Sequence, residues 1–408
     1  MHNRIFCSFV YSKRRKTSLN EFKKIVKKMN VIIAGDFAPR YRLAESVDAE
    51  KFQEIFPNDV CEIIKSADFS FVNFESPITE DDFKPIHKCG PNLHCTPLAA
   101  DAIKFAGFTG VTLANNHVLD YGVAGLHKTV ECCKLIGFDV VGVGNNLSDS
   151  ASVLYLESDG KKLAVINCCE HEFSIATDTE AGANPLNPVR QWYQIQEAKA
   201  NADFVLVIVH GGHEHFQLPS LRMQETYRFF VDAGADAVVN HHQHCYSGYE
   251  IYRGKPIFYG LGNFCFDEKN LRNSAWNQGY MVRIDFSDDS VGFTLYPYIQ
   301  CNDTVLVKLL SDEERGEFDK QLQKLNDIIC DDSLLKQKLS SYYKACSQWE
   351  LSILEPYSGR ILNKLFRLGL VPRFVTGREK LPMVLNRIDC ESHRDKVVFA
   401  LKDMLHKQ

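Results

Sequence analysis

Short apolar runs recur along the first 250 residues, and each of them ends in side chains that can bind a metal ion. Runs of roughly four to eight apolar residues are typical of buried strands. The pattern therefore predicts strands whose carboxyl ends carry polar groups. The runs are residues 31–34 before Asp36, 69–72 before Glu75, 110–114 before Asn115-Asn-His117, 205–209 before His210, and 237–239 before Asn240-His-His-Gln-His-Cys245.

Stretches with helical periodicity lie between these runs. Residues 96–105 and 125–135 carry apolar side chains at three- and four-residue spacing, and Gly107 and Gly137 follow them as helix-ending residues. Alternation of strands and helices predicts a layered α/β fold, in which ligands gather outside the carboxyl ends of the strands. Residues 281–297 alternate instead, as antiparallel strands do.

Beyond residue 300 the apolar residues recur with the spacing of a helix. Ser311-Asp-Glu-Glu314 has the sequence of a capping box, which marks a helix start. Residues 362–374 and 397–405 are also helix-prone, with breaks expected at Gly369, Pro372 and Pro382. We therefore predict three parts: a basic N-terminal arm (residues 1–29), an α/β domain (30–300) and a helical extension (301–408). The expected apolar helix faces are Phe318, Leu322, Leu325 and Ile329, then Leu335, Leu339, Tyr342, Cys346 and Trp349.

Charge and cysteine content narrow the class of protein. A net charge of -5 gives no sign of a nucleic-acid-binding surface. Residues 1–28 hold nine Lys or Arg and one acid but no long apolar run, so we expect neither a signal peptide nor a membrane span. The 14 cysteines are scattered through apolar segments without CxxC spacing, which predicts buried free thiols and a cytoplasmic protein.

The polar residues at the strand ends together predict a metal site. Carboxylate, imidazole and amide ligands at one sheet edge suit one or two Mn, Fe or Zn ions better than Ca. Such ions activate water, so the chemistry implied is hydrolysis. His242 and His244 either face one side of an extended strand or each serve a different ion, and we favour the second arrangement.

His117 follows Asn116 directly and has a different expected role. If the amide of Asn116 binds metal, the adjacent imidazole can stand free at the substrate and protonate a leaving group as a general acid. The alternative interpretation is that Asn115-Asn-His117 is only a turn that closes the strand.

The ordered motifs also resemble those of the capsule-synthesis protein CapA family, which is associated with poly-γ-glutamate and similar in fold to calcineurin-like metallophosphoesterases. The resemblance covers roughly residues 30–290. It implies an α/β/β/α sandwich, and the helical period beyond residue 300 adds a C-terminal helical extension to it. The motifs are Gly35-Asp36, Asn73-Phe-Glu-Ser-Pro77, Ala114-Asn-Asn-His-Val-Leu-Asp-Tyr-Gly122, His210-Gly-Gly-His-Glu214, Gly234-Ala-Asp236, His242-Gln-His244 and Tyr259-Gly-Leu-Gly-Asn-Phe-Cys-Phe-Asp267.

By this resemblance Asp36 and Glu75 are carboxylate ligands, with Glu75 the bridge between two ions. Asn116, His210 and His242 would hold one ion, and His244 would help to hold the other. His117 would be the general acid. Glu214 matches a family position and would bind metal, orient His210 or contact the substrate.

The sequence departs from the related patterns at several positions. Ala38 stands where metallophosphoesterases carry a histidine ligand, which puts the first ion in question. Gly211, His215, Gln243 and Asn240 replace the family's tryptophan, tyrosine, proline and glycine. The additional histidines, at positions 213, 215 and 241, either serve as ligands or line a polar pocket.

Three functions stay open on the sequence. The first is a metal-dependent hydrolase of a phosphoester or of a γ-glutamyl amide, with a phosphorylated small molecule or an acidic polymer as substrate. The second is a non-catalytic component that binds an acidic polymer or scaffolds a biosynthetic assembly around a structural metal site. The third is a cysteine hydrolase that uses Cys168 or Cys169 with His171.

Overall fold

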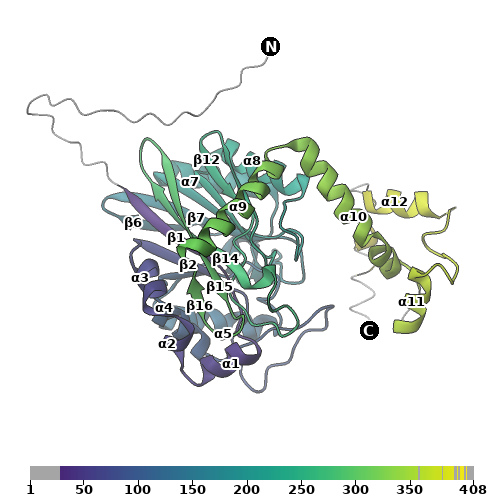
Figure 1. Ribbon diagram of the computed structural model, residues 1–408, viewed down its shortest axis with the longest axis horizontal. Coiled ribbons are helices and arrows are strands. Elements are labelled where there is room, and N and C mark those ends of the chain that lie inside the picture. Colours follow the sequence, from purple (N-terminus) through teal and green to yellow (C-terminus); the bar gives the residue numbers. More distant parts are fainter. Residues whose placement is uncertain are drawn as a thin grey trace, which may run out of the picture.

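The computed structural model describes residues 28–356, 359–378, 380–389, 393, 396–398 and 401. Residues 1–27 of the expected basic arm lie outside this set, and so does most of the expected helix at 397–405. The two-sheet core and a projecting set of C-terminal helices are visible in Figure 1.

The first sheet is mixed, and its central strand carries Asp36. The strand order is β16-β15-β14-β1-β2-β3-β4, with β13 paired beside the end of β1. Strands β1 to β4 are parallel, whereas β14, β15 and β16 extend the sheet in antiparallel fashion. The bounds are β1 (Met29–Phe37), β2 (Phe69–Phe74), β3 (Gly110–Thr112), β4 (Asp139–Val141), β13 (Asn263–Cys265), β14 (Gln278–Phe286), β15 (Val291–Gln300) and β16 (Val307–Leu309).

The second sheet has the order β11-β12-β10-β9-β7-β6. Its inner strands β7, β9, β10 and β12 are parallel, and its two edge strands are antiparallel. The bounds are β6 (Leu154–Ser158), β7 (Lys161–Cys169), β9 (Phe204–His210), β10 (Ala237–His241), β11 (Tyr249–Tyr252) and β12 (Lys255–Phe258). A small separate sheet joins β5 (Val143–Gly144) to β8 (Gly182–Ala183).

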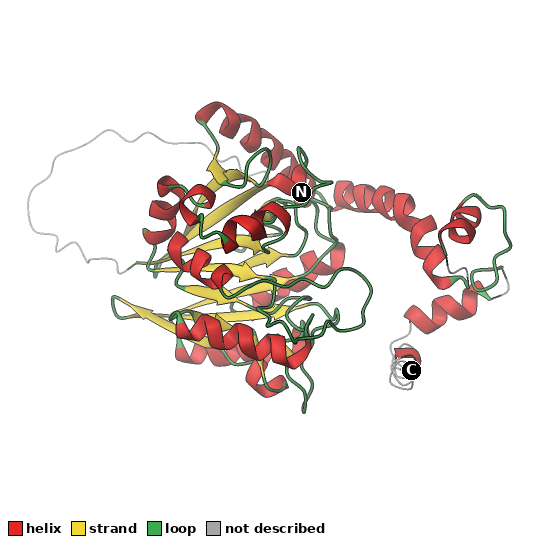
Figure 2. Cartoon of the chain, turned by 90° about the horizontal axis from the view of Figure 1, so that it is seen from below, coloured by secondary structure: helices red, strands yellow, loops and turns green. Residues whose placement is uncertain are grey.

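The two sheets lie face to face between layers of helices, as Figure 2 shows. Helices α1 to α5 pack on the outer face of the first sheet, and α7 and α8 pack on the outer face of the second. The predicted α/β/β/α sandwich with a C-terminal helical extension is therefore confirmed. The helices are α1 (Tyr41–Asp48), α2 (Phe52–Ile55), α3 (Asn58–Lys65), α4 (Leu98–Ala106), α5 (Gly122–Leu135), α6 (Leu147–Ser150), α7 (Pro188–Asn201), α8 (Leu221–Ala233) and the 3-10 helix η1 (Ala275–Asn277).

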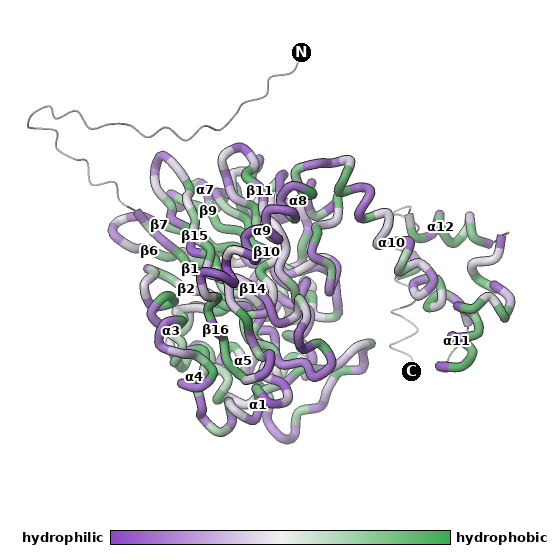
Figure 3. The backbone as a smooth tube through the Cα atoms, in the orientation of Figure 1, coloured by the Kyte–Doolittle hydropathy of each residue, from purple (hydrophilic) through white to green (hydrophobic). Residues whose placement is uncertain are grey.

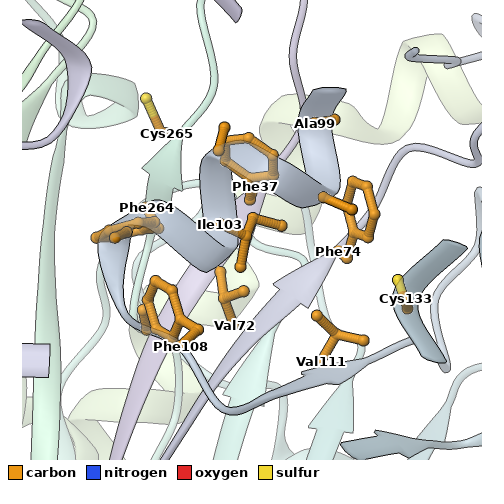
Figure 4. Close-up of a cluster of buried hydrophobic side chains, with 14 of the residues drawn as sticks. Phe37, Val72, Phe74, Ala99, Ile103, Phe108, Val111, Cys133, Phe264 and Cys265 are labelled. Carbon is orange, nitrogen blue, oxygen red and sulfur yellow. The ribbon is translucent and has the colours of Figure 1, made fainter. Parts of the chain in front are cut away.

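Alternation along β1 explains how one strand serves two cores. Val31 and Ile33 face the second sheet, whereas Ile32 and Ala34 face the helices, because successive side chains of a strand point to opposite faces. All four are fully buried, and burial of one valine or isoleucine side chain stabilises the fold by about 1.5–3 kcal/mol. Figure 4 shows the helix-side core, in which Phe37 lies among side chains from β2, α4 and β13.

The C-terminal part begins on the core and then leaves it. The capping box at Ser311 is confirmed and starts α9 (Asp312–Ile329), and α10 (Asp332–Leu354) follows. Figure 1 shows α10 carrying α11 (Arg360–Arg367) and α12 (Leu381–Asp389) away from the sheets. Pro382 lies in the first turn of α12, where a proline is tolerated, so the expected break there was wrong. In Figure 3 the projecting helices carry both hydrophobic and hydrophilic segments.

The division of the chain at residue 300 stays a prediction. Strand β16 adds to the first sheet beyond that residue, and Phe318 and Leu322 of α9 are buried in the core between the sheets. Among the described residues, no helix is both long and apolar enough to cross a membrane. Nine of the described cysteines are buried free thiols, as predicted.

A close backbone crossing fixes the position of Asp36. The Asp36 amide donates to the carbonyl of Gly262 over 3.3 Å, and Asp36 is in register with Asn263 of β13. A Cβ at position 35 would lie only 1.8 Å from that carbonyl oxygen. Glycine is therefore required at position 35 for packing rather than for backbone conformation.

We expect Gly35→Ala to lower the free energy of unfolding by about 3 kcal/mol or more, because the clash is with backbone that has no rotamer to change. Gly292→Ala is the control, since a Cβ at that strand position meets open space. Urea unfolding of both variants measures the difference. If the two variants are equally stable, the backbone crossing does not require glycine at position 35.

Candidate metal centre

Polar side chains from both sheets meet at one edge of the sandwich. Asp36 lies near the end of β1, Glu75 directly follows β2, and His210 ends β9. His241, the last residue of β10, is in register with His210, so the chain of His242 to His244 emerges beside it. The structure thus brings the ends of four strands together, as the sequence pattern indicated.

Asp36 is fully buried and well supplied with donors. The Asn73 amide donates to Oδ1 over 2.8 Å, the His242 backbone amide donates to Oδ2 over 3.1 Å, and His244 Nδ1 lies 3.5 Å from Oδ2. Burial favours a higher pKa for Asp36, but the hydrogen bond from His244 and the nearby imidazoles outweigh it and hold the pKa below its ordinary value. Asp36 is therefore a fixed negative charge.

Glu75 is equally buried but has no donor. Both carboxylate oxygens lack a hydrogen-bond partner among the described residues. Oε1 instead lies 3.9 Å from Nε2 of His117, 3.8 Å from Nε2 of His210 and 3.7 Å from Nε2 of His244. Burial raises the pKa of Glu75 well above its ordinary value, with the charge of His244 opposing it. A buried carboxylate that accepts no hydrogen bond and lies among imidazole nitrogens fits a site for a divalent cation.

His210, His242 and Asn116 form the second half of the cluster. His210 Nε2 lies 3.0 Å from Oδ1 of Asn116 and 3.1 Å from Nδ1 of His242. Burial lowers the pKa of His210 well below its ordinary value and that of His242 to about 4, with repulsion between neighbouring histidines adding to the effect. Both rings are therefore neutral and able to bind metal at neutral pH.

The segment from His242 to His244 is a left-handed turn rather than an extended strand. β10 ends at His241, and φ is 90° at His242 and 56° at His244. The Asn240 side chain holds this turn by donating to the carbonyls of Gly211, His241 and Tyr259. Residues other than glycine keep a positive φ only where surrounding contacts enforce it, and such residues cluster at functional sites.

The two histidines lie together in one group with Glu214, and each also belongs to a fully buried trio of its own. His242 lies with Glu75 and His210, whereas His244 lies with Asp36 and Glu75, and in each trio the potential ligand atoms are within 4.8 Å of one another. Glu75 belongs to both trios. Burial lowers the pKa of His244, but the charges of Glu75 and Asp36 outweigh it and raise the pKa to about 10.

His117 is oriented by a buried ion pair. Its Nδ1 lies 2.6 Å from Oδ2 of Asp120 and 3.2 Å from Nζ of Lys88, while Lys88 and Asp120 form an ion pair with each other. Its Nε2 therefore points toward Glu75, 3.9 Å from Oε1. Burial lowers the pKa of His117 although Asp120 opposes the shift. The Asn115–His117 segment is a turn after β3 that also places the His117 imidazole beside Glu75.

Glu214 lies at the entrance rather than among the buried groups. It is exposed, yet its carboxylate can approach His242 and His244 within 4.8 Å. It lines both a cavity of about 660 Å³ that reaches His242 and a cavity of about 340 Å³ that reaches His117 and His244. His215 lines both cavities as well, and His213 lines the larger one. His213 and His215, which have no counterpart in the family motif, therefore line the entrance to the buried cluster.

Ala38 marks an apolar wall beside the site. It is fully buried against Leu93, Phe266 and Trp276. The ligand missing at this position is therefore replaced by hydrophobic packing. His241, the remaining additional histidine, is buried beside Asp36 and contributes to the low pKa of that carboxylate.

Several contacting residues were missed at the sequence level. Asn116 donates to Glu172 over 3.0 Å, and His242 Nε2 lies 3.9 Å from the same carboxylate oxygen. Glu172 follows β7, whose apolar run 163–168 was interpreted only through its cysteines. Asn73, Lys88 and Asp120 were also missed as supporting residues. Asn73 and Asp120 lie within the motifs quoted above, whereas no local pattern marks Lys88.

The cysteine hydrolase has no support from this geometry. Cys168 and Cys169 are buried in β7, with 0% and 1% of their surface exposed. Burial raises the pKa of both thiols far above the ordinary value, so neither forms a thiolate at neutral pH.

Residues 30–268 match the model of the bacterial capsule synthesis protein family PGA_cap. The chain belongs to this family. It is 34% identical over 249 residues to the capsule biosynthesis protein CapA of Bacillus anthracis, covering 59% of this chain and 60% of that protein. It is 34% identical over 249 residues to the PGA biosynthesis protein CapA of Bacillus subtilis strain 168, covering 59% and 65%. The match thus spans less than two thirds of either relative.

A solved structure of a putative 5'-nucleotidase from Staphylococcus aureus, in complex with α-ketoglutarate, overlaps this family member in part. The TM-score is 0.42 at 14% sequence identity, and the overlap covers 73% of this chain and 58% of that one.

If Glu75 lacks hydrogen bonds because it binds a cation, its replacement should change the metal content without lowering the free energy of unfolding of the metal-free protein. We expect Glu75→Gln to lose bound metal while the metal-free protein keeps its stability or gains about 1 kcal/mol, because a buried charge without donors is removed. Elemental analysis and urea unfolding measure the two effects. The exposed Glu62→Gln should change neither. Retained metal together with a large loss of stability would make Glu75 a structural group.

Proposed function

We propose that this PGA_cap family member is a metal-dependent hydrolase that acts on a γ-glutamyl amide or a phosphoester. The observation that carries the proposal is the Glu75 carboxylate, which accepts no hydrogen bond from the described residues and belongs to two trios of buried potential ligands. Asp36, Glu75 and His244 would hold one divalent cation, and Glu75, His210 and His242 would hold another, with Asn116 beside them. A mixed nitrogen and oxygen ligand set suits Mn, Fe or Zn.

A cation in such a site supplies Lewis acidity to a water molecule and to an acyl or phosphoryl oxygen of the substrate. The protein's own groups would do the rest. His117, oriented through Nδ1 by Asp120 and Lys88, offers Nε2 toward the site and can donate a proton to the leaving group. Glu214 at the entrance would contact the substrate or complete the ligands around His242 and His244.

The names of the relatives guide the choice of substrate. One is called a PGA biosynthesis protein and another a capsule biosynthesis protein. An acidic polymer of γ-linked glutamate is therefore the partner that we propose first, with a phosphorylated small molecule as the alternative. The cytoplasmic location expected from the cysteines stays a prediction.

A second function is favoured by one specific observation. Because Ala38 and its apolar neighbours replace a ligand, the Asp36 trio has fewer groups for a cation than the site it resembles. A non-catalytic component that binds an acidic polymer around a structural metal site would keep the remaining ligands. Polymer binding without hydrolysis, across added Mn, Fe and Zn, would favour this function.

The first test is elemental analysis of the protein purified without chelator, beside Asp36→Ala and His242→Ala variants that stay folded by circular dichroism. We expect up to two Mn, Fe or Zn ions per chain, lost in part or entirely in the variants, because each change removes a ligand from a different trio. Turnover of γ-glutamyl anilides and phenyl phosphates is measured on the same samples. Undiminished turnover in both variants would refute the hydrolase.

The general acid has its own test. We expect His117→Gln to lower kcat by about 100-fold or more while the metal content stays unchanged, because only the proton donor is removed. The exposed His127→Gln on α5 is the matched control and should leave kcat unchanged. A lost metal ion in His117→Gln would make His117 a ligand instead.

A further inference from the structure

A third cavity lies next to the metal centre, between α8 and α10. It has a volume of about 570 Å³, and its polar lining includes Arg222 of α8 and Lys336, Ser340, Tyr343 and Lys344 of α10. The α10 residues recur at three- and four-residue spacing, which places them on one face of the helix. Among the described residues, no acidic side chain lines this cavity.

The two lysines of this cavity have no ion-pair partner among the described residues, although Lys336 also borders a neighbouring cavity that Glu225, Asp232 and Asp332 line. Neither Lys336 nor Lys344 has an acidic partner within 4 Å in the part of the chain that the structure describes, and both are exposed. Arg222 forms an ion pair with Glu170, but the exposed guanidinium has further N–H groups to donate. Excess basic charge in a concave surface favours an anionic ligand.

This basic cavity adjoins the cavity of about 660 Å³ that reaches His242, because His213 and Arg222 line both of them. The wall between them is fixed by α10. His213 Nε2 lies 3.1 Å from the Tyr343 hydroxyl, and the rings of Phe216 and Tyr342 stack with centroids 4.0 Å apart. The two cavities therefore form one elongated surface that begins at the metal centre.

The charges along this surface differ from end to end. Glu170, Glu172 and Glu214 line the cavity at the metal centre, whereas the far cavity carries only basic and neutral groups. A small phosphoester would occupy one cavity alone. A polymer with one anionic group in each repeat would use both, with one unit at the metal centre and another in the basic cavity.

We infer that the cavity between α8 and α10 binds a carboxylate of an anionic polymer, on a unit near the one placed at the metal centre. The inference deepens the proposed function, and it rests on that function for the polymer unit placed at the metal centre. The α10 residues lie beyond residues 30–268, so this part of the site belongs to the C-terminal helices rather than to the matched family region.

Binding of fluorescein-labelled poly-γ-glutamate oligomers to the full-length chain, followed by fluorescence anisotropy, tests the inference. We expect the double variant Lys336→Glu/Lys344→Glu to raise Kd by about tenfold or more, with a smaller effect at high salt. Lys336→Arg/Lys344→Arg should bind like the unmodified chain. The single variant Lys336→Glu should also raise Kd, and Lys338→Glu is its matched control, because both make the same charge change on α10 and Lys338 does not line the cavity.

The outcomes separate this inference from the hydrolase proposal. Asp36→Ala, which removes metal and turnover, should still bind the oligomers through the basic cavity. Absence of oligomer binding to the unmodified chain would overturn the inference whatever the metal content, and so would an equal loss in Lys338→Glu. If inorganic phosphate displaces the oligomers at equal concentration, the cavity is a phosphate site. That result would also overturn the inference that the cavity binds an anionic polymer.

Discussion

A buried carboxylate without a hydrogen-bond donor is the constraint around which this site is organised. Glu75 follows the second strand of a closely packed sandwich, neither of its oxygens accepts a hydrogen bond from the described residues, and Oε1 lies within 4 Å of three imidazoles. A protein interior tolerates such a group only when a positive charge compensates it. The surrounding features, from the donors on Asp36 to the turn at His242, hold the neighbouring ligands around this one charge.

Much of this arrangement could be predicted from the sequence, because strand ends are local features. Apolar runs mark the strands, and parallel strands deliver the residues after them to one edge. That rule brings Asp36 beside Glu75 in the first sheet and His210 beside His242 in the second, whereas the meeting of the two sheets at this edge was implied only by the family resemblance. The left-handed turn did not follow, because no glycine marks it and the contacts of Asn240 that enforce it come from distant segments.

The partners of His117 and the C-terminal helices show the same limit. Asp120 is three residues from His117 and lies within a quoted motif, but Lys88 comes from a loop with no periodic pattern. The helical period of α10 predicted an apolar face that includes Tyr342, but it gave no indication that Tyr342 would line the cavity at the metal centre or that the basic residues would line the adjoining cavity. Local patterns describe an element, whereas its neighbours depend on packing across the whole chain.

The crossing of Gly35 and Gly262 has a consequence for how this protein can evolve. The two positions are far apart in the sequence, yet one lacks a side chain because the backbone of the other occupies its space. A larger residue at position 35 would be tolerated only if the segment around 262 moved, and that segment carries the pairing of Asp36 with Asn263. Substitution at position 35 is therefore limited by the path of the backbone at 262 and not by which side chain stands there.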